Sequence, residues 1–209
     1  MIHLTQITLD FITVAGLHIR DAYDWHQRAW QCFPGRDGRQ RDFLTRLDRC
    51  PEIFRLLIVS PIKPVRPDWC PAESECWKTK PIPETYFTHH RYVFQLCANP
   101  TRKLAAQNPD GSFKKNGRRA PLGGREQLVA WISRKGEHGG FTVAEDALRT
   151  FTRGREYFEK NGMRGLHSAV EFRGVLTVTD PQRFRETFTR GMGSAKAFGF
   201  GLLVLAPIA

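Results

Sequence analysis

The sequence lacks the cysteine pairs and long apolar runs that would mark several classes of protein. Its five cysteines are an odd number and include no CxxC pair, so a disulfide scaffold and a structural zinc site are both disfavoured. No apolar run is long enough to span a bilayer, and the first basic residue is Arg20, which argues against a signal peptide. We therefore expect a cytoplasmic protein with free thiols and no membrane partner.

The residue patterns of metal-dependent nucleases and of nucleotide-binding enzymes are also missing. Glu145 and Asp146 are adjacent carboxylates that read as a turn or a helix start, and His89 and His90 would point to opposite sides of a strand. A P-loop would need a Gly-Lys-Ser/Thr end, which the sequence does not contain. If the protein cleaves a phosphodiester, we therefore predict that it uses no metal or other cofactor and that the 2′-hydroxyl of RNA is the nucleophile.

Positive charge is what the sequence has in excess. The formal net charge is +11, and it is unevenly spread: residues 1–100 carry a net +2 and residues 101–209 a net +9. A basic half beside a near-neutral half favours a polyanionic partner that is held mainly by the second half. Nucleic acid is the partner we favour, although basic side chains also serve to solvate a surface.

The order of the expected elements predicts an α+β protein built from two tandem ferredoxin-like (βαββαβ) domains, at residues 1–90 and 91–209. Asn161-Gly162 is a strong signal for a hairpin between two of the strands. The expected strands are 2–14, 53–60, 92–98, 147–158, 166–178 and the last residues of the chain. The expected helices are about 21–32, a stretch with Phe43, Leu44 and Leu47 on one side, about 124–135, and 181–190.

Two segments look irregular. Residues 61–83 hold six of the thirteen prolines, which excludes regular structure throughout but leaves room for a short edge strand. Residues 107–124 are polar, basic and rich in glycine, so we expect a mobile loop there.

A glycine-rich loop with Ser194 and Lys196 precedes the final strand. Four glycines within residues 191–201 allow the backbone to curl around an anion. Asp180-Pro181 predicts a helix before this loop, whereas a dinucleotide-binding loop runs from strand to helix. A nucleotide or phosphate-ligand enzyme is therefore disfavoured, and the remaining interpretations are an RNA-binding element or a simple helix end with a turn.

The helix expected from Asp21 carries the best candidates for acid–base chemistry. Tyr23, His26 and Trp30 share one face of it. Histidine as a residue type titrates near neutral pH, and a phenol can orient a phosphate oxygen. The competing interpretation is that His26 is a packed histidine between tryptophans.

The strand expected at 147–158 alternates arginines with aromatic residues. Its odd positions are Arg149, Phe151, Arg153, Arg155 and Tyr157, which would all project from one face. Such a face suits phosphates and bases together, although a charged edge strand that resists aggregation has the same pattern. We favour RNA binding.

Three segments of the chain resemble the CasE family, the CRISPR repeat-processing endoribonucleases of type I-E Cascade. The segments are residues 20–36, which contain Tyr23 and His26, residues 94–103, and the glycine loop with the final Leu-Leu-Val-Leu-Ala-Pro. In this order they cover essentially the whole chain. Cys97 departs from the pattern, since an arginine is common at that place.

The resemblance implies a metal-independent enzyme with His26 as catalytic residue and Tyr23 as its partner. It would cleave CRISPR precursor RNA below the repeat hairpin, leave a 2′,3′-cyclic (or 3′-) phosphate and a 5′-hydroxyl, and stay bound to the crRNA beside other Cascade subunits. A non-catalytic subunit that binds the RNA hairpin is the alternative. The residues that we predict to bind RNA are Arg102, Lys103, Arg149, Arg153, Arg155, Gly193, Ser194 and Lys196.

Overall fold

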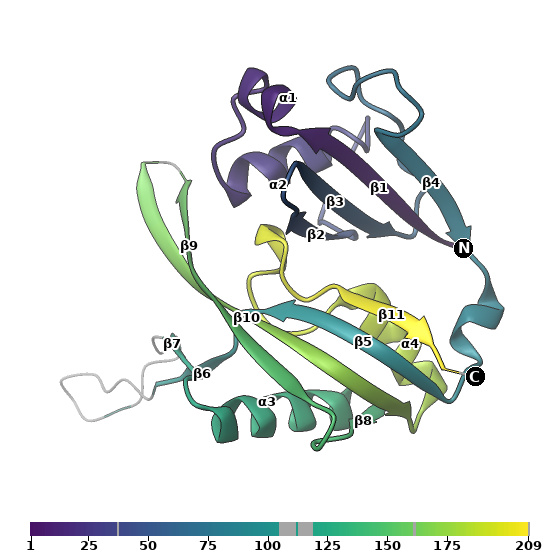
Figure 1. Ribbon diagram of the computed structural model, residues 1–209, viewed down its shortest axis with the longest axis vertical. Helices are drawn as coiled ribbons and strands as arrows, with labels where there is room; N and C mark the ends of the chain where they lie inside the picture. The colour runs from purple at the N-terminus through teal and green to yellow at the C-terminus, as the bar shows by residue number, and fades with distance from the viewer. Residues whose placement is uncertain (37, 105–111, 113–118, 161, 209) are drawn as a thin grey trace.

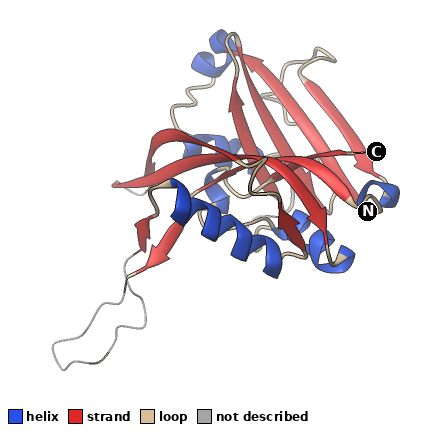
Figure 2. Cartoon of the chain, turned by 60° about the horizontal axis from the view of Figure 1, so that its bottom comes forward, coloured by secondary structure: helices blue, strands red, loops and turns tan. Residues whose placement is uncertain are grey.

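The structure is a computed structural model that describes all residues except 37, 105–111, 113–118, 161 and 209. Two antiparallel sheets, one from each half of the chain, face each other, and helices lie on the outer sides (Figures 1 and 2). The loop expected at 107–124 falls mostly outside the described residues, as does Asn161 of the expected hairpin turn.

The N-terminal sheet has the strand order β2-β3-β1-β4. Its strands are β1 (Ile2–Asp10), β2 (Leu44–Arg49), β3 (Ile53–Ser60) and β4 (Trp77–Ile82). β3 confirms the strand expected at 53–60, and β4 is the short edge strand that the proline-rich segment allowed. Helix α2 (Ala22–Trp30) confirms the helix expected at about 21–32.

The first strand is shorter than expected. It ends at Asp10, whose carboxylate accepts a hydrogen bond from the backbone N–H of Thr13 at 2.7 Å. This N-cap begins the short helix α1 (Phe11–Gly16), so the strand expected over residues 2–14 was wrong at its end.

The helix expected around Phe43 is also wrong, because this segment forms β2. Phe43 packs in the core beneath α1 and α2, whereas Leu44 belongs to the core between the two sheets. Consecutive residues that face opposite cores have the period of a strand. Helical spacing of Phe43, Leu44 and Leu47 was coincidental in so short a run, and pairing with β3 decided the structure.

The C-terminal sheet has the order β11-β5-β10-β8, and β9 also pairs with β10. Two long helices, α3 (Arg125–His138) and α4 (Pro181–Arg190), confirm the expectations for 124–135 and 181–190. The strands are β5 (Arg91–Ala98), β8 (Phe141–Val143), β9 (Arg149–Lys160), β10 (Met163–Val178) and β11 (Leu203–Pro207). β8 and the small pair β6 (Thr101–Lys103) and β7 (Arg119–Pro121) were not predicted.

Both sheets place their strands in the order expected of a ferredoxin-like domain, with β8 and β9 sharing one place in the second. The chain therefore consists of two tandem ferredoxin-like domains. The first departs from the βαββαβ pattern, because residues 61–76 form turns and no second helix. Between the sheets, Ile2, Leu44 and Val59 share one apolar core with Leu96 and Leu203, which holds the two sheets together.

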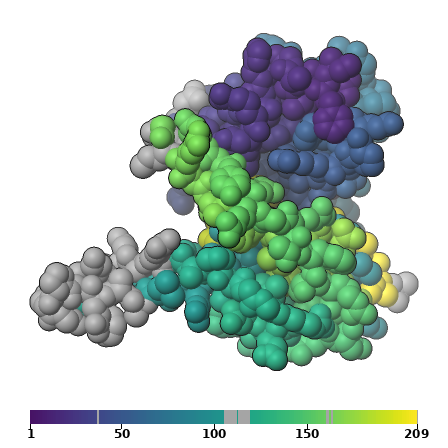
Figure 3. Space-filling view, turned by 60° about the vertical axis from the view of Figure 1, so that its left-hand side comes forward, coloured from purple at the N-terminus to yellow at the C-terminus, as the bar shows by residue number. Residues whose placement is uncertain are grey.

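The β9–β10 hairpin extends beyond the rest of its sheet and reaches the N-terminal domain beside α2 (Figures 1 and 3). Its register shifts between Ala169 and Val170, where a bulge in β9 leaves Arg153 without a partner position. Thr152 pairs with Val170, and Gly154, at φ +93°, pairs with Ala169.

The bulge corrects the expectation of a single basic face on β9. Arg149 and Phe151 lie opposite Arg173 and Glu171, on the side of the sheet that faces the N-terminal domain. Beyond the bulge, Arg155 and Tyr157 lie opposite Ser168 and Leu166, which have the other parity in β10. The extra residue exchanges the two faces, so the odd positions do not project together.

Candidate active site

Helix α2 positions the expected catalytic pair. Its N-cap is Asp21, whose Oδ1 accepts hydrogen bonds from the backbone N–H groups of Tyr23 (2.8 Å) and Asp24 (3.0 Å). The other oxygen, Oδ2, accepts from the backbone N–H of Glu159 in β9 at 3.0 Å. One carboxylate therefore fixes both the start of α2 and the place of the β9–β10 hairpin beside it.

His26 is half-buried on α2 among aromatic neighbours. Its Nε2 accepts a hydrogen bond from the indole N–H of Trp30 at 3.1 Å, and its ring centroid lies 6.4 Å from that of Phe43. We assign the proton of the neutral ring to Nδ1, because Nε2 is the acceptor. One edge of the ring is packed against aromatic neighbours, as the competing interpretation expected. His26 also lines a cavity between the two sheets.

This cavity, the interdomain cavity, has a volume of about 400 Å³ and is rich in arginine. Phe198 and Gly199 of the glycine loop line it as well. Guanidinium groups around a concave space suit a phosphate, because each presents several donors in a fixed plane. The charged lining consists of Arg20, Arg46, Arg49, Arg153, Arg155, Asp21, Asp48, Glu156 and Glu171.

The cavity gathers only part of the expected site. Of those residues it is lined by His26, Arg153 and Arg155. Tyr23 lies one turn before His26 and is half-buried, but the described lining does not include it. The remaining expected residues lie elsewhere: Arg102 and Lys103 are exposed on β6, Arg149 is exposed on β9, and Gly193, Ser194 and Lys196 belong to the glycine loop.

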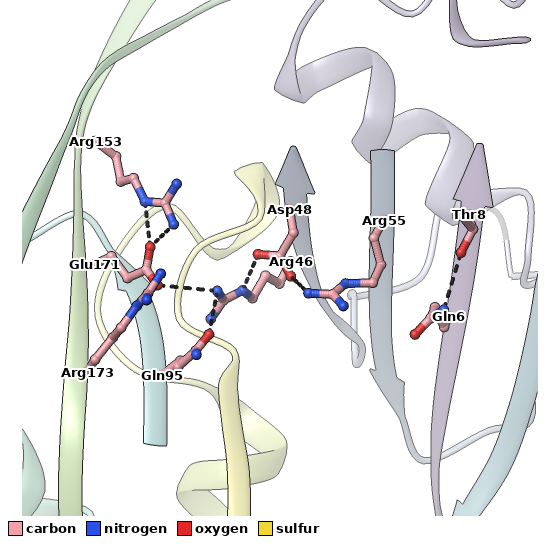
Figure 4. A network of polar contacts seen from close by, with 9 residues as sticks. All are labelled: Gln6, Thr8, Arg46, Asp48, Arg55, Gln95, Arg153, Glu171 and Arg173. Carbon is pink, nitrogen blue, oxygen red and sulfur yellow. Dashed lines mark hydrogen bonds and ion pairs between the residues drawn. The ribbon is translucent and has the colours of Figure 1, made fainter. Parts of the chain in front are cut away.

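Part of a buried charge network, whose contacts Figure 4 shows, lines one wall of the cavity. Glu171 of β10 is 1% exposed, and its carboxylate accepts hydrogen bonds from Arg153 and from Arg173. Arg46 of β2, 3% exposed, lies 3.8 Å from the same carboxylate and donates to Gln95 of β5. The network therefore links the two sheets through charges that are almost entirely removed from water.

The network continues to Asp48, which accepts from Arg46 and Arg55, each at 2.8 Å. Burial alone would raise the pKa of Asp48, but the two guanidinium groups hold it below its ordinary value. Glu156 differs: burial raises its pKa, and Arg49 and Arg153 offset this only in part.

Cys97 stands in this wall where the resemblance leads us to expect an arginine. Burial raises the pKa of its thiol to about 11, so the side chain is uncharged at neutral pH. The positive charges of Arg46 and Arg153 act on it in the opposite sense. These two guanidinium groups supply positive charge to the same cavity from other positions of the chain.

The glycine loop is built for close packing. A Cβ at Gly201, at φ +89°, would lie 2.4 Å from the carbonyl oxygen of Met192, and one at Gly191 would lie 2.8 Å from the side chain of Leu44. Lys196 turns inward, and its Nζ donates to the carbonyl oxygen of Arg190 at 2.8 Å, at the end of α4. Burial lowers its pKa, and so do the charges of Arg41, Lys135 and Arg190.

Gly193 and Ser194 line a second cavity, of about 410 Å³, with Asn99, Arg119 and His167. The Oγ of Ser194 donates to the carbonyl oxygen of Asn99 at 3.2 Å. His167 also contacts Phe198 at 4.8 Å between ring centroids, and Phe198 lines the interdomain cavity. The two residues are thus in contact, although each lines a different cavity.

His167 is a second histidine with a distinctive environment, and no motif in the sequence points to it. Its Nδ1 lies 3.1 Å from the side-chain nitrogen of Asn99, its ring stacks on Phe158 at 4.8 Å, and burial lowers its pKa. Its Nε2 is buried and has no hydrogen-bond partner in the described part of the chain. The neutral ring therefore suits this place better than the cation.

We expect His167 to make stability depend on pH in the acidic range. A histidine whose pKa is lowered by folding stabilises the fold above its unfolded pKa of about 6.5. This contribution is lost as the pH falls from about 6.5 through the lower folded pKa. Urea unfolding at pH 7.5 and pH 5 should show a larger loss of stability for the wild type than for His167→Phe. An equal loss in both proteins would contradict the assignment.

Arg46 and Glu171 were also missed from the sequence, although a signal was present. Each is a charged residue inside an apolar run, Phe43-Leu44-Thr45-Arg46-Leu47 and Ala169-Val170-Glu171-Phe172. Two opposite charges in such runs are a reason to expect a buried pair.

The described residues contain no group of three or more His, Cys, Asp or Glu side chains placed to hold a metal ion. None of the helices in the described ranges is long and apolar enough to cross a membrane.

Comparison with known proteins gives matches over nearly the whole chain. The family model described as "CRISPR associated protein" matches residues 2–207. The chain is 31% identical over 204 residues to the CRISPR system Cascade subunit CasE of Escherichia coli (strain K12), covering 96% of this chain and 99% of that protein. It is 32% identical over 154 residues to the CRISPR-associated endoribonuclease Cse3 of Thermus thermophilus, covering 68% and 69%. The solved structure of Thermus thermophilus Cse3 bound to an RNA representing a pre-cleavage complex has a TM-score of 0.75 at 28% identity, covering 99% of each chain.

Proposed function

The chain belongs to the family of CRISPR-associated proteins that includes CasE and Cse3, and from this membership we propose that it is an endoribonuclease that processes CRISPR precursor RNA. It cleaves at the base of each repeat hairpin and remains bound to the mature crRNA as a subunit of Cascade. The observation that carries the proposal is the position of His26, on the wall of an arginine-lined cavity between the two sheets. Five free cysteines are compatible with the cytoplasm as the place where it acts.

The reaction that we propose is attack by the 2′-oxygen of RNA on the adjacent phosphorus, without a metal. The bond from phosphorus to the 5′-oxygen breaks, which leaves a 2′,3′-cyclic phosphate and a 5′-hydroxyl. His26 exchanges a proton with the 2′-hydroxyl or with the leaving oxygen, and Tyr23 orients the phosphate. Arg153 balances the negative charge that develops on the phosphate oxygens, and Arg155, whose side chain lies on the other face of β9, contributes to the grip on the flanking RNA.

We assign the remaining expected residues to the grip on the RNA, with the domains dividing at residues 90 and 91. Arg102, Lys103 and Arg149 are exposed, as phosphate contacts must be. Gly193 and Ser194 line the second cavity, where their backbone N–H groups are the donors that we assign to a phosphate, since the Ser194 hydroxyl already donates to Asn99. The inward hydrogen bonds of Lys196 make its contribution chiefly one of long-range charge, and its ammonium group holds the loop against α4.

Purified protein incubated with a labelled repeat RNA in EDTA should cut it once, at the base of the hairpin, as fast as in magnesium. An RNA with deoxyribose on the 5′ side of the scissile phosphate should bind equally well but stay intact, since the nucleophile is missing. Strong inhibition by EDTA would contradict the metal-free mechanism. Binding of the normal RNA without cleavage would instead identify a non-catalytic hairpin-binding subunit.

A further inference from the structure

An exposed phenylalanine lies near the start of strand β9, on the face of the C-terminal sheet that looks toward the N-terminal domain. Phe151 is 46% exposed, although its neighbours across the sheet belong to a buried network. The guanidinium group of Arg173 lies over its ring, 5.2 Å from the centroid. This contact fixes the ring in position and leaves a large part of it accessible.

Two further arginines, Arg149 and Arg153, lie two residues before and two residues after Phe151 in β9. The Arg149 guanidinium donates to the carbonyl oxygens of Asp146 and Leu148. Arg149 lies opposite Arg173 in the register of β9 and β10, and Arg153 follows Phe151 at the bulge. The side chains of Arg153 and Arg173 are 48% and 47% exposed, while both donate to the buried Glu171 beneath them. One carboxylate thus holds both guanidinium groups, and the N–H groups that it does not bind face solvent.

The phenylalanine and its arginines continue the interdomain cavity along β9. Arg153 and Glu171 line the cavity together with His26, whereas Phe151 and Arg149 lie farther along the strand and outside the lining. A polyanion that leaves the cavity past Arg153 therefore meets Phe151 next. A protein-docking face is disfavoured here, because one phenylalanine among three guanidinium groups offers little apolar area and much unbalanced positive charge.

We propose that Phe151 is a stacking platform for an unpaired nucleotide of the RNA strand that adjoins the cleaved hairpin. The base stacks on the accessible part of the ring, and Arg149, Arg153 and Arg173 bind the flanking phosphates. This combination of an aromatic ring with arginines is typical of single-strand binding, because every base has a face that can stack. The inference rests on the proposed function and adds to it a second RNA-binding site that is specific for unpaired sequence.

Fluorescence anisotropy with four RNAs tests the platform. They are the hairpin alone, the hairpin with unpaired nucleotides on its 5′ side, the hairpin with unpaired nucleotides on its 3′ side, and an unstructured oligonucleotide. Phe151→Ala should weaken binding of the unstructured RNA and of one extended hairpin by about 5- to 100-fold, since loss of one stacked base has effects of this size. The affinity for the hairpin alone should stay the same. Phe151→Tyr should bind all four RNAs as the wild type does, because tyrosine keeps an aromatic ring for stacking. The extended hairpin whose affinity falls shows on which side of the cleavage site the stacked nucleotide lies.

Phe11→Ala is the matched control, because Phe11 is 48% exposed and lies on α1, away from the cavity. It should leave all four affinities unchanged. The inference would be overturned if Phe151→Ala weakened the binding of all four RNAs equally, or if it weakened the binding of none. In the second case the face around Phe151 would be a contact surface for a protein subunit. Cleavage is measured separately, so a wild type that fails to cut but binds unpaired RNA through Phe151 refutes only the proposed function.

Discussion

Replacement of His26 by glutamine is expected to lower the rate of RNA cleavage by about 10²–10⁴-fold, the range typical of a lost general acid or base. The glutamine amide oxygen can still accept the hydrogen bond that the indole of Trp30 donates to Nε2, but an amide cannot exchange a proton at neutral pH. The structure of α2 and the affinity for the hairpin should therefore be preserved. Single-turnover cleavage of labelled RNA, with anisotropy on a deoxy-substituted RNA, measures the two effects separately.

Trp30→Phe is the matched control for this experiment. It removes the indole donor and keeps the imidazole, so it separates the effect of the hydrogen bond from that of the proton transfer. We expect a much smaller loss of rate than for His26→Gln. Full activity of His26→Gln would exclude His26 as the proton-transfer residue. A loss of hairpin affinity as large as the loss of rate would make it a binding residue.

The position of this site could be predicted from the sequence only where local chemistry determines it. Asp21 before a helical run specifies an N-cap, and the structure has that cap and places Tyr23 and His26 one turn apart. The reason that His26 lines a cavity is not local. It depends on Glu159, 138 residues after Asp21, whose backbone N–H donates to the carboxylate of Asp21.

The wrong predictions for β9 and β2 also arise from contacts between residues that are not neighbours in the sequence. One extra residue at Arg153 exchanges the two faces of β9. Gly154, at φ +93°, is the one residue in the strand whose type could have indicated a bulge. The strand β2 was missed because its neighbour β3 supplies its hydrogen bonds, and helical spacing of three apolar residues cannot reveal that. Likewise, the sequence predicts RNA binding for Lys196, but it cannot show that the ammonium group donates to the carbonyl oxygens at the end of α4.

Removal of the charge of Glu171 is expected to destabilise the protein by about 3–5 kcal/mol, the range for breaking a buried ion pair from one side. Glu171→Gln keeps the shape of the side chain but leaves Arg46, Arg153 and Arg173 without their common anion. Arg153 and Arg173 can turn to solvent, because about half of each side chain is already exposed. Arg46, with 4% of its side chain exposed, cannot turn to solvent, and among the described residues it then retains only Asp48 as an anionic partner.

Urea unfolding of a double-mutant cycle isolates the link between the two sheets. Arg46→Met removes the buried cation, and Glu171 then still has two arginines, so we expect Arg46→Met to cost less than Glu171→Gln. In Arg46→Met/Glu171→Gln the buried Arg46 cation is absent, so the loss of Glu171 no longer leaves that cation without its partner. The double variant should therefore be more stable, by about 0.5–3 kcal/mol, than the sum of the two single losses predicts. Arg183→Ala is the control, since the pair of Arg183 with Asp180 is exposed and should contribute no more than about 1 kcal/mol. Additive effects in the cycle would mean that Arg46 and Glu171 do not act together across the interdomain wall.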